Sequence, residues 1–200
     1  MRKQTKLVAV LSTAALLAIG ASMTSFAATG WAEEDGTWVY YNRDGERATD
    51  QWKKSGNNWY WLDSDGEMAI DQLIEDGDNY YYVDINGVMA ANQWVAIDNE
   101  DAGQDDEPDH YWYYFQANGK ALKNGDNSKV ALKTVNGKKY AFDDEGRMLF
   151  GWVSADNAER IDNTDGDGFK EGDYYFGGED DGAMTVGWLQ MDITYDEATD

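Results

Sequence analysis

The sequence has no cysteine, one histidine and one proline among its 200 residues. Without cysteine the chain forms no disulfide, carries no thiol nucleophile and builds no iron–sulfur or cysteine-based zinc site. A single histidine leaves no histidine-rich metal site. Basic residues are also few, with 16 lysines and arginines against 39 acids and a formal net charge of −23. A surface this acidic repels polyphosphates, so nucleic acid and bare anionic membrane are not expected partners.

Aromatic residues and glycine are abundant instead. The chain has 9 Trp, 13 Tyr, 6 Phe and 21 Gly. Disordered acidic chains are poor in aromatic residues, so this composition indicates an ordered protein. It favours many short strands and turns with rings packed between them.

The N-terminus has the pattern of an export signal. Basic residues at positions 2, 3 and 6 precede a largely apolar run from Leu7 to Ile19, and the small-residue pattern Ser25-Phe26-Ala27 follows. We therefore expect a signal-peptide helix over residues 1–27, cleaved after Ala27, and a secreted domain over 28–200 with no membrane insertion after cleavage. The alternative is an uncleaved anchor, because the uncharged stretch 7–28 is just long enough to span a bilayer.

The rest of the chain is a row of repeats. The leading apolar position advances by about 21 residues, through Trp31, Trp52, Leu73 and Trp94. A turn glycine advances in the same way, through positions 45, 66 and 87. Two insertions, 98–109 and about 155–172, stretch the period further along the chain. We count six repeats and an incomplete seventh, which is typical of a repeat architecture.

Each repeat has the pattern of a β-hairpin. Trp, Tyr, Val and Phe favour strands, and the dipeptides Asp44-Gly45, Asp65-Gly66 and Asn86-Gly87 favour turns. In the strand 59–62 both faces are apolar, so both need cover, which neighbouring hairpins can supply. The expected fold is all-β: a solenoid of about six stacked β-hairpin repeats of about 21 residues with two insertions, preceded by the signal-peptide helix.

The spacing of the rings predicts aromatic cages where one hairpin meets the next. The first cage would consist of Trp31, Trp38 and Tyr60, and the second of Trp52, Trp59 and Tyr81, with Met68 as a soft wall of the second. Rings around a gap attract a cation at about 0.5–2 kcal/mol per contact, and a weakly hydrated quaternary ammonium fits best. The alternative is that these rings are only core.

The pattern Gly-Trp, spacer, Gly, Trp-Tyr-Tyr, spacer, Asp-Gly resembles the cell-wall-binding repeats of Gram-positive surface proteins. That family includes choline-binding repeats and the related glucan-binding type, and the resemblance covers nearly all of residues 29–192. It implies a β-hairpin solenoid that anchors a protein to the cell envelope. In the choline-binding branch, two aromatic residues of one repeat and one of the next hold choline, and these positions correspond to the two cages named above.

Some repeats depart from this pattern. Arg47 replaces the methionine of the next two repeats and would place a positive charge near the first cage. The third set begins with Leu73, followed by Tyr80 and Tyr113. The fourth has Trp94 and Trp112, but we expect Ala141 at its partner position. Only the first two junctions between neighbouring hairpins are therefore expected to keep all three rings.

Other chemistry has weaker support. Residues 163–168 resemble the start of a calcium loop, but the twelfth position is Tyr174 and not an acid, which favours a solvated loop and no metal site. His110 lies at the edge of an insertion and is expected to be a surface or packing residue and not a catalytic base. No nucleophile elbow, zinc-protease helix or phosphate loop is present. We expect no catalytic residues, no cofactor and no enzyme activity.

These observations favour a non-catalytic module that recognises choline or a similar cationic group on a cell-wall polymer, such as a choline-bearing teichoic acid or glycan. Two alternatives remain open. One is a carbohydrate-binding module for glucan or oligosaccharide, because Trp and Tyr also stack on sugars. The other is an adhesin-like structural surface protein. In each case the expected location is secreted and associated with the cell wall or surface.

Overall fold

The computed structural model describes residues 29–104, 107–125 and 129–191. The expected signal-peptide helix over 1–27 lies outside these residues. The described chain forms six antiparallel two-stranded hairpins. Their strands are β1 (Gly30–Glu34), β2 (Thr37–Tyr41), β3 (Gln51–Ser55), β4 (Asn58–Leu62), β5 (Gln72–Asp76), β6 (Asn79–Val83), β7 (Gln93–Asp98), β8 (His110–Phe115), β9 (Lys133–Val135), β10 (Lys138–Tyr140), β11 (Trp152–Val153) and β12 (Tyr174–Tyr175).

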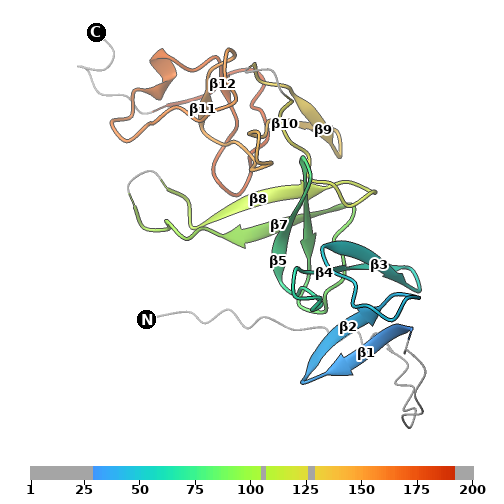
Figure 1. The fold of residues 1–200 in the computed structure, drawn as a ribbon. Helices are drawn as coiled ribbons and strands as arrows, with labels where there is room; N and C mark the ends of the chain where they lie inside the picture. Colours follow the sequence, from blue (N-terminus) through green and yellow to red (C-terminus); the bar gives the residue numbers. More distant parts are fainter. Residues whose placement is uncertain (1–28, 105–106, 126–128, 192–200) are drawn as a thin grey trace, which may run out of the picture.

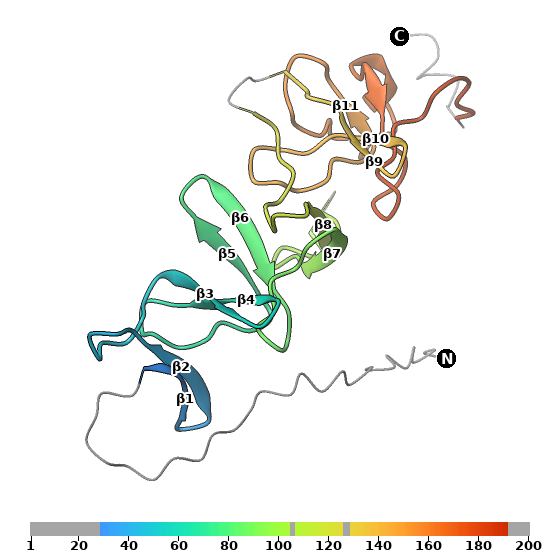
Figure 2. The same cartoon turned by 90° about the vertical axis from the view of Figure 1, so that its right-hand side faces the viewer.

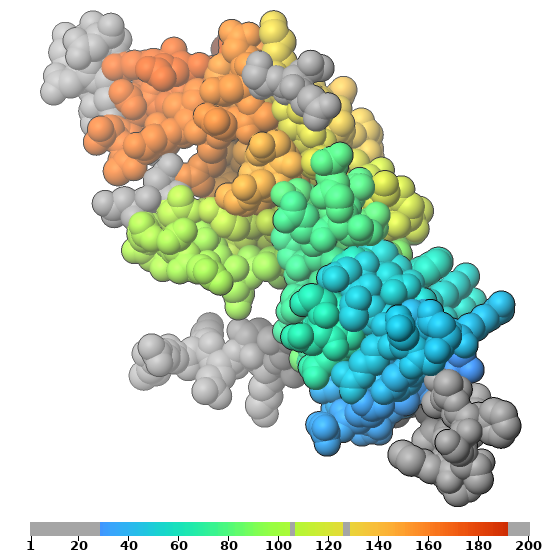
Figure 3. All heavy atoms as spheres, in the orientation of Figure 1, coloured from blue at the N-terminus to red at the C-terminus, as the bar shows by residue number. Residues whose placement is uncertain are grey.

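The hairpins are stacked along one long axis, with β1 and β2 at one end and β11 and β12 at the other (Figures 1 and 2). The space-filling view has the same elongated outline (Figure 3). Within the described residues the one helical element is a short 3-10 turn, η1 (Gly168–Lys170). No helix there is long and apolar enough to cross a membrane. The all-β hairpin solenoid predicted from the sequence is confirmed.

Each repeat has two turns with different roles. The hairpin tip of β1 and β2 contains Asp35 (φ 52°) and Gly36 (φ 85°), two consecutive residues with positive φ, as a two-residue type I′ hairpin requires. The dipeptide Asp65-Gly66 and its equivalents lie in a second turn, after the hairpin. There Asp63 Oδ1 accepts hydrogen bonds from the backbone N–H groups of Asp65 and Glu67, both at 2.9 Å. This second turn sends the chain back along the previous hairpin.

We call the segment between one hairpin and the next the tail. Five tails are each bound to the hairpin that comes before their own, through a backbone hydrogen bond of 2.8–2.9 Å at the equivalent position. The donor and acceptor residues are Met68 and Trp38, Met89 and Trp59, Ala121 and Tyr80, Met148 and Trp112, and Met184 and Lys139. We call each such junction a seam and number it by its first hairpin.

The buried apolar side chains gather at the seams and not in one central core. One cluster joins Trp61 and Ala69 of the second repeat to Ile74, Tyr81 and Val83 of the third. Similar clusters join the third repeat to the fourth, the fourth to the fifth, and the fifth to the sixth. Because each inner hairpin buries its two faces against two neighbours, the stack is stabilised by nearest-neighbour contacts.

The two insertions lie at hairpin tips. Residues 99–109 join β7 to β8, and residues 154–173 join β11 to β12 and contain η1. Insertions at tips lengthen the connection without breaking the register of the strands, since Trp94 still pairs with Tyr114 and Trp152 with Tyr175. The stack therefore continues past both insertions.

Candidate functional site

The first seam forms the predicted first cage. Trp31 on β1, Trp38 on β2 and Tyr60 on β4 line a small hollow together with Met68 of the next tail. The centroids of the Trp31 and Tyr60 rings are 5.3 Å apart, and their planes meet at 73°. The hollow is too narrow to admit water with the side chains in place. A ligand must therefore displace the flexible Met68 side chain or turn a ring.

The placement of Met68 corrects the sequence analysis, which assigned it to the second cage. The Met68 backbone N–H binds the Trp38 carbonyl at 2.8 Å, so the tail of the second repeat lies along the first hairpin. By the same register Arg47 lies on the other side of the first hairpin, where its guanidinium contacts Glu34 and Tyr41. The expectation that Arg47 adds a charge to the first cage is wrong.

The second seam repeats this geometry. The Trp52 and Tyr81 ring centroids are 5.0 Å apart at 58°, and Trp59, bonded through its carbonyl to the Met89 N–H, is 40% exposed. Met89 packs against the cluster that contains Trp52 and Tyr81, so it takes the role predicted for Met68. Burial, with a smaller contribution from nearby Asp76, raises the pKa of the Tyr81 phenol, which therefore stays neutral at physiological pH.

The fourth seam also holds a complete set of rings, which the sequence analysis did not predict. Trp94 faces Tyr140 with ring centroids 4.9 Å apart at 58°, the same arrangement as at the second seam. Trp112 and Met148 belong to the same cluster, and the Met148 N–H binds the Trp112 carbonyl at 2.8 Å. The partner position is therefore Tyr140 and not Ala141, which is fully buried one residue further on.

The error came from the stretched period, which left the alignment one residue out of place. A sequence signal that could have found Tyr140 is its distance from the turn glycine. The inner tyrosine lies six residues before that glycine, as Tyr60 does before Gly66, Tyr81 before Gly87 and Tyr140 before Gly146. Counting back from the glycine gives the correct partner.

The third and fifth seams lack full cages. The third brings Leu73, Tyr80 and Tyr113 together as predicted, with Ala121 where the others have methionine. At the fifth, Lys139 occupies the position of the outer ring. A lysine there repels a cation instead of presenting a negative ring face. Three seams, the first, second and fourth, therefore carry the arrangement suited to a small apolar cation.

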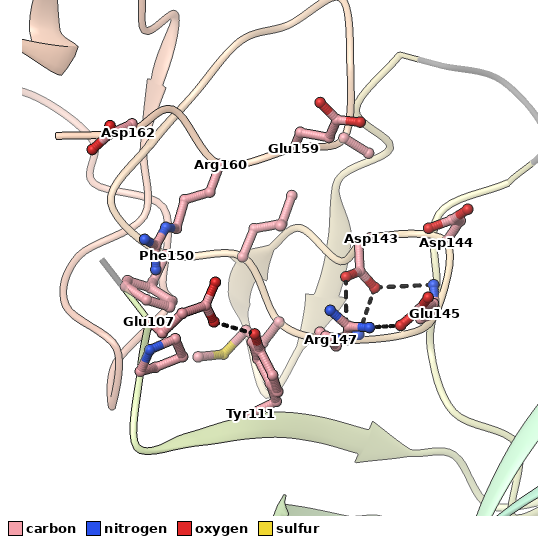
Figure 4. Close-up of a pocket in the computed structure, with 14 residues that line it drawn as sticks. Glu107, Tyr111, Asp143, Asp144, Glu145, Arg147, Phe150, Glu159, Arg160 and Asp162 are labelled. Carbon is pink, nitrogen blue, oxygen red and sulfur yellow. Dashed lines mark hydrogen bonds and ion pairs between the residues drawn. The ribbon is translucent and has the colours of Figure 1, made fainter. Parts of the chain in front are cut away.

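A cavity of about 400 Å³ lies between the two insertions (Figure 4). Its wall carries six carboxyl groups and two guanidinium groups, with Arg147 4.7 Å from the Tyr111 ring centroid and Arg160 4.1 Å from that of Phe150. Asp143 is the most perturbed acid there: burial raises its pKa to about 6, although Arg147 and backbone N–H groups oppose the rise. Its Oδ1 accepts the Glu145 and Arg147 N–H groups, as Asp63 does in its own turn, so its role is structural.

The calcium-like loop satisfies its own polar groups. Asp162 Oδ1 accepts both the N–H and the hydroxyl of Thr164, and Asn163 Oδ1 accepts the Gly168 N–H at 2.8 Å. No group of three or more acids or histidines with metal-binding geometry occurs in the part of the chain that the structure describes. These contacts fit the solvated acidic loop favoured by the sequence.

The raised pKa of Asp143 gives a prediction for stability. A carboxyl whose folded-state pKa of about 6 exceeds its ordinary value of 3.8 binds more protons in the folded state, so its contribution falls as the pH rises from about 4 to 6 and stays low above that. Asp143→Asn keeps the turn acceptor but buries no charge. We expect it to raise the free energy of unfolding at pH 7 by up to about 3 kcal/mol and to change it little at pH 4.

Urea unfolding at pH 4 and pH 7 measures this difference, with Asp63→Asn as the matched change in another repeat. An equal effect of Asp143→Asn at both pH values would contradict the prediction.

Comparison with known proteins gives consistent matches. Residues 28–69 and 48–94 match the choline-binding repeat family, and residues 111–121 match the cell wall binding repeat. No curated protein matches the chain. The choline-binding domain of Spr1274 from Streptococcus pneumoniae is 32% identical over 48% of this chain and 95% of that domain, with a TM-score of 0.35.

Choline-binding protein F from Streptococcus pneumoniae is 26% identical, with a TM-score of 0.52. The match covers 82% of this chain but only 47% of protein F, so this chain spans less than half of that relative. A second structure of protein F, with the same identity, coverage and TM-score, was determined in the presence of a peptidoglycan analogue, a tetrasaccharide-pentapeptide.

Proposed function

This chain belongs to the choline-binding repeat family, and from that premise we propose that it is a non-catalytic module that binds choline, or a similar quaternary ammonium group, on a cell-wall polymer. The binding sites are the cages at the first, second and fourth seams. The ligand-contacting residues are Trp31, Trp38, Tyr60 and Met68; Trp52, Trp59, Tyr81 and Met89; and Trp94, Trp112, Tyr140 and Met148.

The observation that carries this proposal is the recurrence of one ring arrangement. At three seams a leading tryptophan meets the inner tyrosine of the next hairpin at 4.9–5.3 Å, with an outer tryptophan and a methionine beside them. Core packing alone does not require an outer tryptophan that is 40% exposed, as Trp59 is. Ring faces attract a cation without a buried carboxylate, and a methylated ammonium loses little hydration on entering.

The charge of the chain supports a cationic ligand group. A formal net charge of −23 raises the local concentration of cations and repels phosphate. A polyanionic wall polymer therefore binds only through its cationic substituents, which enter the cages while the phosphates stay in solvent. We also propose that residues 1–27 direct export and that the module acts at the cell surface.

Titration of the purified 28–200 domain with choline tests the proposal. At about 100 times the dissociation constant, choline should stabilise the fold by about 2.7 kcal/mol for each cage that it fills, and should change the tryptophan fluorescence. Ethanolamine is the matched control, because its ammonium keeps strongly hydrated N–H groups. An unchanged Tm and fluorescence at high millimolar choline would overturn the proposal, and glycan binding that survives excess choline would favour the carbohydrate alternative.

A further inference from the structure

Two of the three cages have a tryptophan whose indole N–H is bound by a carboxylate. Trp52 Nε1 donates to Asp76 Oδ2 at 3.1 Å, and Asp76 ends the first strand of the next hairpin. Trp112 Nε1 donates to Asp180 Oδ1 at 3.1 Å, and the same oxygen lies 3.0 Å from His110 Nε2. Asp180 belongs to the tail after β12, so it reaches back across 68 residues to β8.

The first cage lacks this bond. Trp31 Nε1 is buried without a hydrogen-bond partner among the described residues. The position that corresponds to Asp76 in the first cage is Ser55, since both residues end the first strand of their hairpin and pair with an asparagine across it. The three cages thus share their rings but differ in which indole a carboxylate holds. It is the leading Trp52 in the second cage and the outer Trp112 in the fourth, whereas the leading Trp31 of the first cage has no such bond within the described part of the chain.

A carboxylate on the indole N–H affects a bound cation in three ways. It fixes the ring in one orientation, so less conformational entropy is lost on binding. It draws positive charge toward the N–H edge and leaves the ring face more negative, which strengthens a cation–π contact. Its own charge also attracts the cation, although at Asp180, whose side chain is 69% exposed, water screens this attraction.

Other features indicate that both carboxylates act on their cages. Asp76 contributes to the raised pKa of the Tyr81 phenol, so its charge is felt at the third ring of the second cage. The hydrogen bond from Trp112 and, to a smaller extent, the one from His110 lower the pKa of Asp180, so this carboxyl is ionised at neutral pH.

We propose that Asp76 and Asp180 are positioning residues that make the second and fourth cages stronger cation sites than the first. This inference rests on the proposed function. It adds an order of filling: choline occupies the second and fourth seams before the first, although all three cages carry the same rings.

Site-resolved titration tests this order. The indole N–H signals in a ¹⁵N-labelled 28–200 domain report each cage separately, and choline is the probe. We expect the signals of Trp52 and Trp112 to saturate at about 5-fold lower choline than that of Trp31, or lower still. Asp180→Ala should weaken the fourth cage about 5-fold and leave the second unchanged, and Asp76→Ala should do the reverse.

Conservative variants separate positioning from general charge. Asp180→Asn keeps an acceptor for the indole and should recover part of the affinity that Asp180→Ala loses. In a Trp112→Phe background, which keeps a ring but has no N–H, Asp180→Ala should have a smaller effect than in the native chain. Asp65→Ala removes an exposed acid from a turn outside the cages and serves as the control for net charge.

A gain of function provides the complementary test. Ser55→Asp should place an acceptor near Trp31 Nε1 and bring the choline affinity of the first cage close to that of the second. Equal affinities at all three cages that neither alanine variant changes would overturn the inference while leaving the proposed function intact. Indole signals that do not respond to choline at all would overturn the proposed function itself.

Discussion

Replacing Gly87 by valine is expected to lower the free energy of unfolding by about 2–5 kcal/mol. Gly87 has φ +74°, a conformation that a β-branched residue avoids. A Cβ atom there would lie 2.9 Å from Met68 Cε and 3.0 Å from the Ala69 carbonyl oxygen. The side chain would therefore push apart the tails of the second and third repeats and displace Met68, the wall of the first cage. Urea unfolding of the 28–200 domain measures the loss.

Gly77→Val is the matched control in the same repeat. Gly77, at the tip of β5 and β6, has φ +59°, and nothing lies within 4 Å of the place where its Cβ would be. The control variant therefore has backbone strain without a clash at the seam and should lose about 1–3 kcal/mol. Only Gly87→Val should weaken choline binding at the first cage. Equal losses of stability and equal binding in the two variants would show that the turn glycine is not selected by packing.

Trp59→Ala is expected to weaken choline binding at the second cage by about 10-fold or more, because the outer ring provides one desolvated cation–π contact. Since Trp59 is 40% exposed, its loss should lower the free energy of unfolding by no more than about 1 kcal/mol. The indole signals of the first and fourth cages should keep their native titration curves. Calorimetry should show one fewer site per chain in the working range.

Trp188→Ala provides the control for this change. Trp188 is fully exposed and lies outside all three cages, so its removal tests whether an exposed tryptophan alone binds the probe. Its loss should leave both the affinity and the number of sites unchanged. Native binding in Trp59→Ala, or an equal loss in both variants, would contradict the assignment of the second cage.

The sequence predicted the fold because its signals are local. Alternating rings and a repeat of about 21 residues specify hairpins, and hairpins with two apolar faces must stack. The dipeptides Asp44-Gly45, Asp65-Gly66 and Asn86-Gly87 do mark turns, but these turns follow the hairpins and do not join their strands. The expected rings of the first two seams do come together in space, with Trp31 against Tyr60 and Trp52 against Tyr81. Whether they bind choline stays a prediction for the titration.

The errors concern contacts between repeats. Met68 was assigned to the wrong seam because the sequence does not tell whether a tail lies on its own hairpin or on the previous one; the hydrogen bond to Trp38 decides this. Tyr140 was missed because an insertion removed the constant spacing. The bond from Trp112 to Asp180 joins residues 68 apart, which no local pattern could predict.

The bonds between tails and hairpins also determine how the stack responds to mechanical tension. The hairpins follow one another along the long axis (Figure 2), so a pull on the two ends loads the seams between them in series. The third seam, where Leu73 and Ala121 replace the tryptophan and methionine of its neighbours, has no full cage to hold a cation. A cation held in a cage would contact two hairpins at once and act as a reversible cross-link between them. Binding to the wall polymer would therefore raise the force needed to separate those two hairpins.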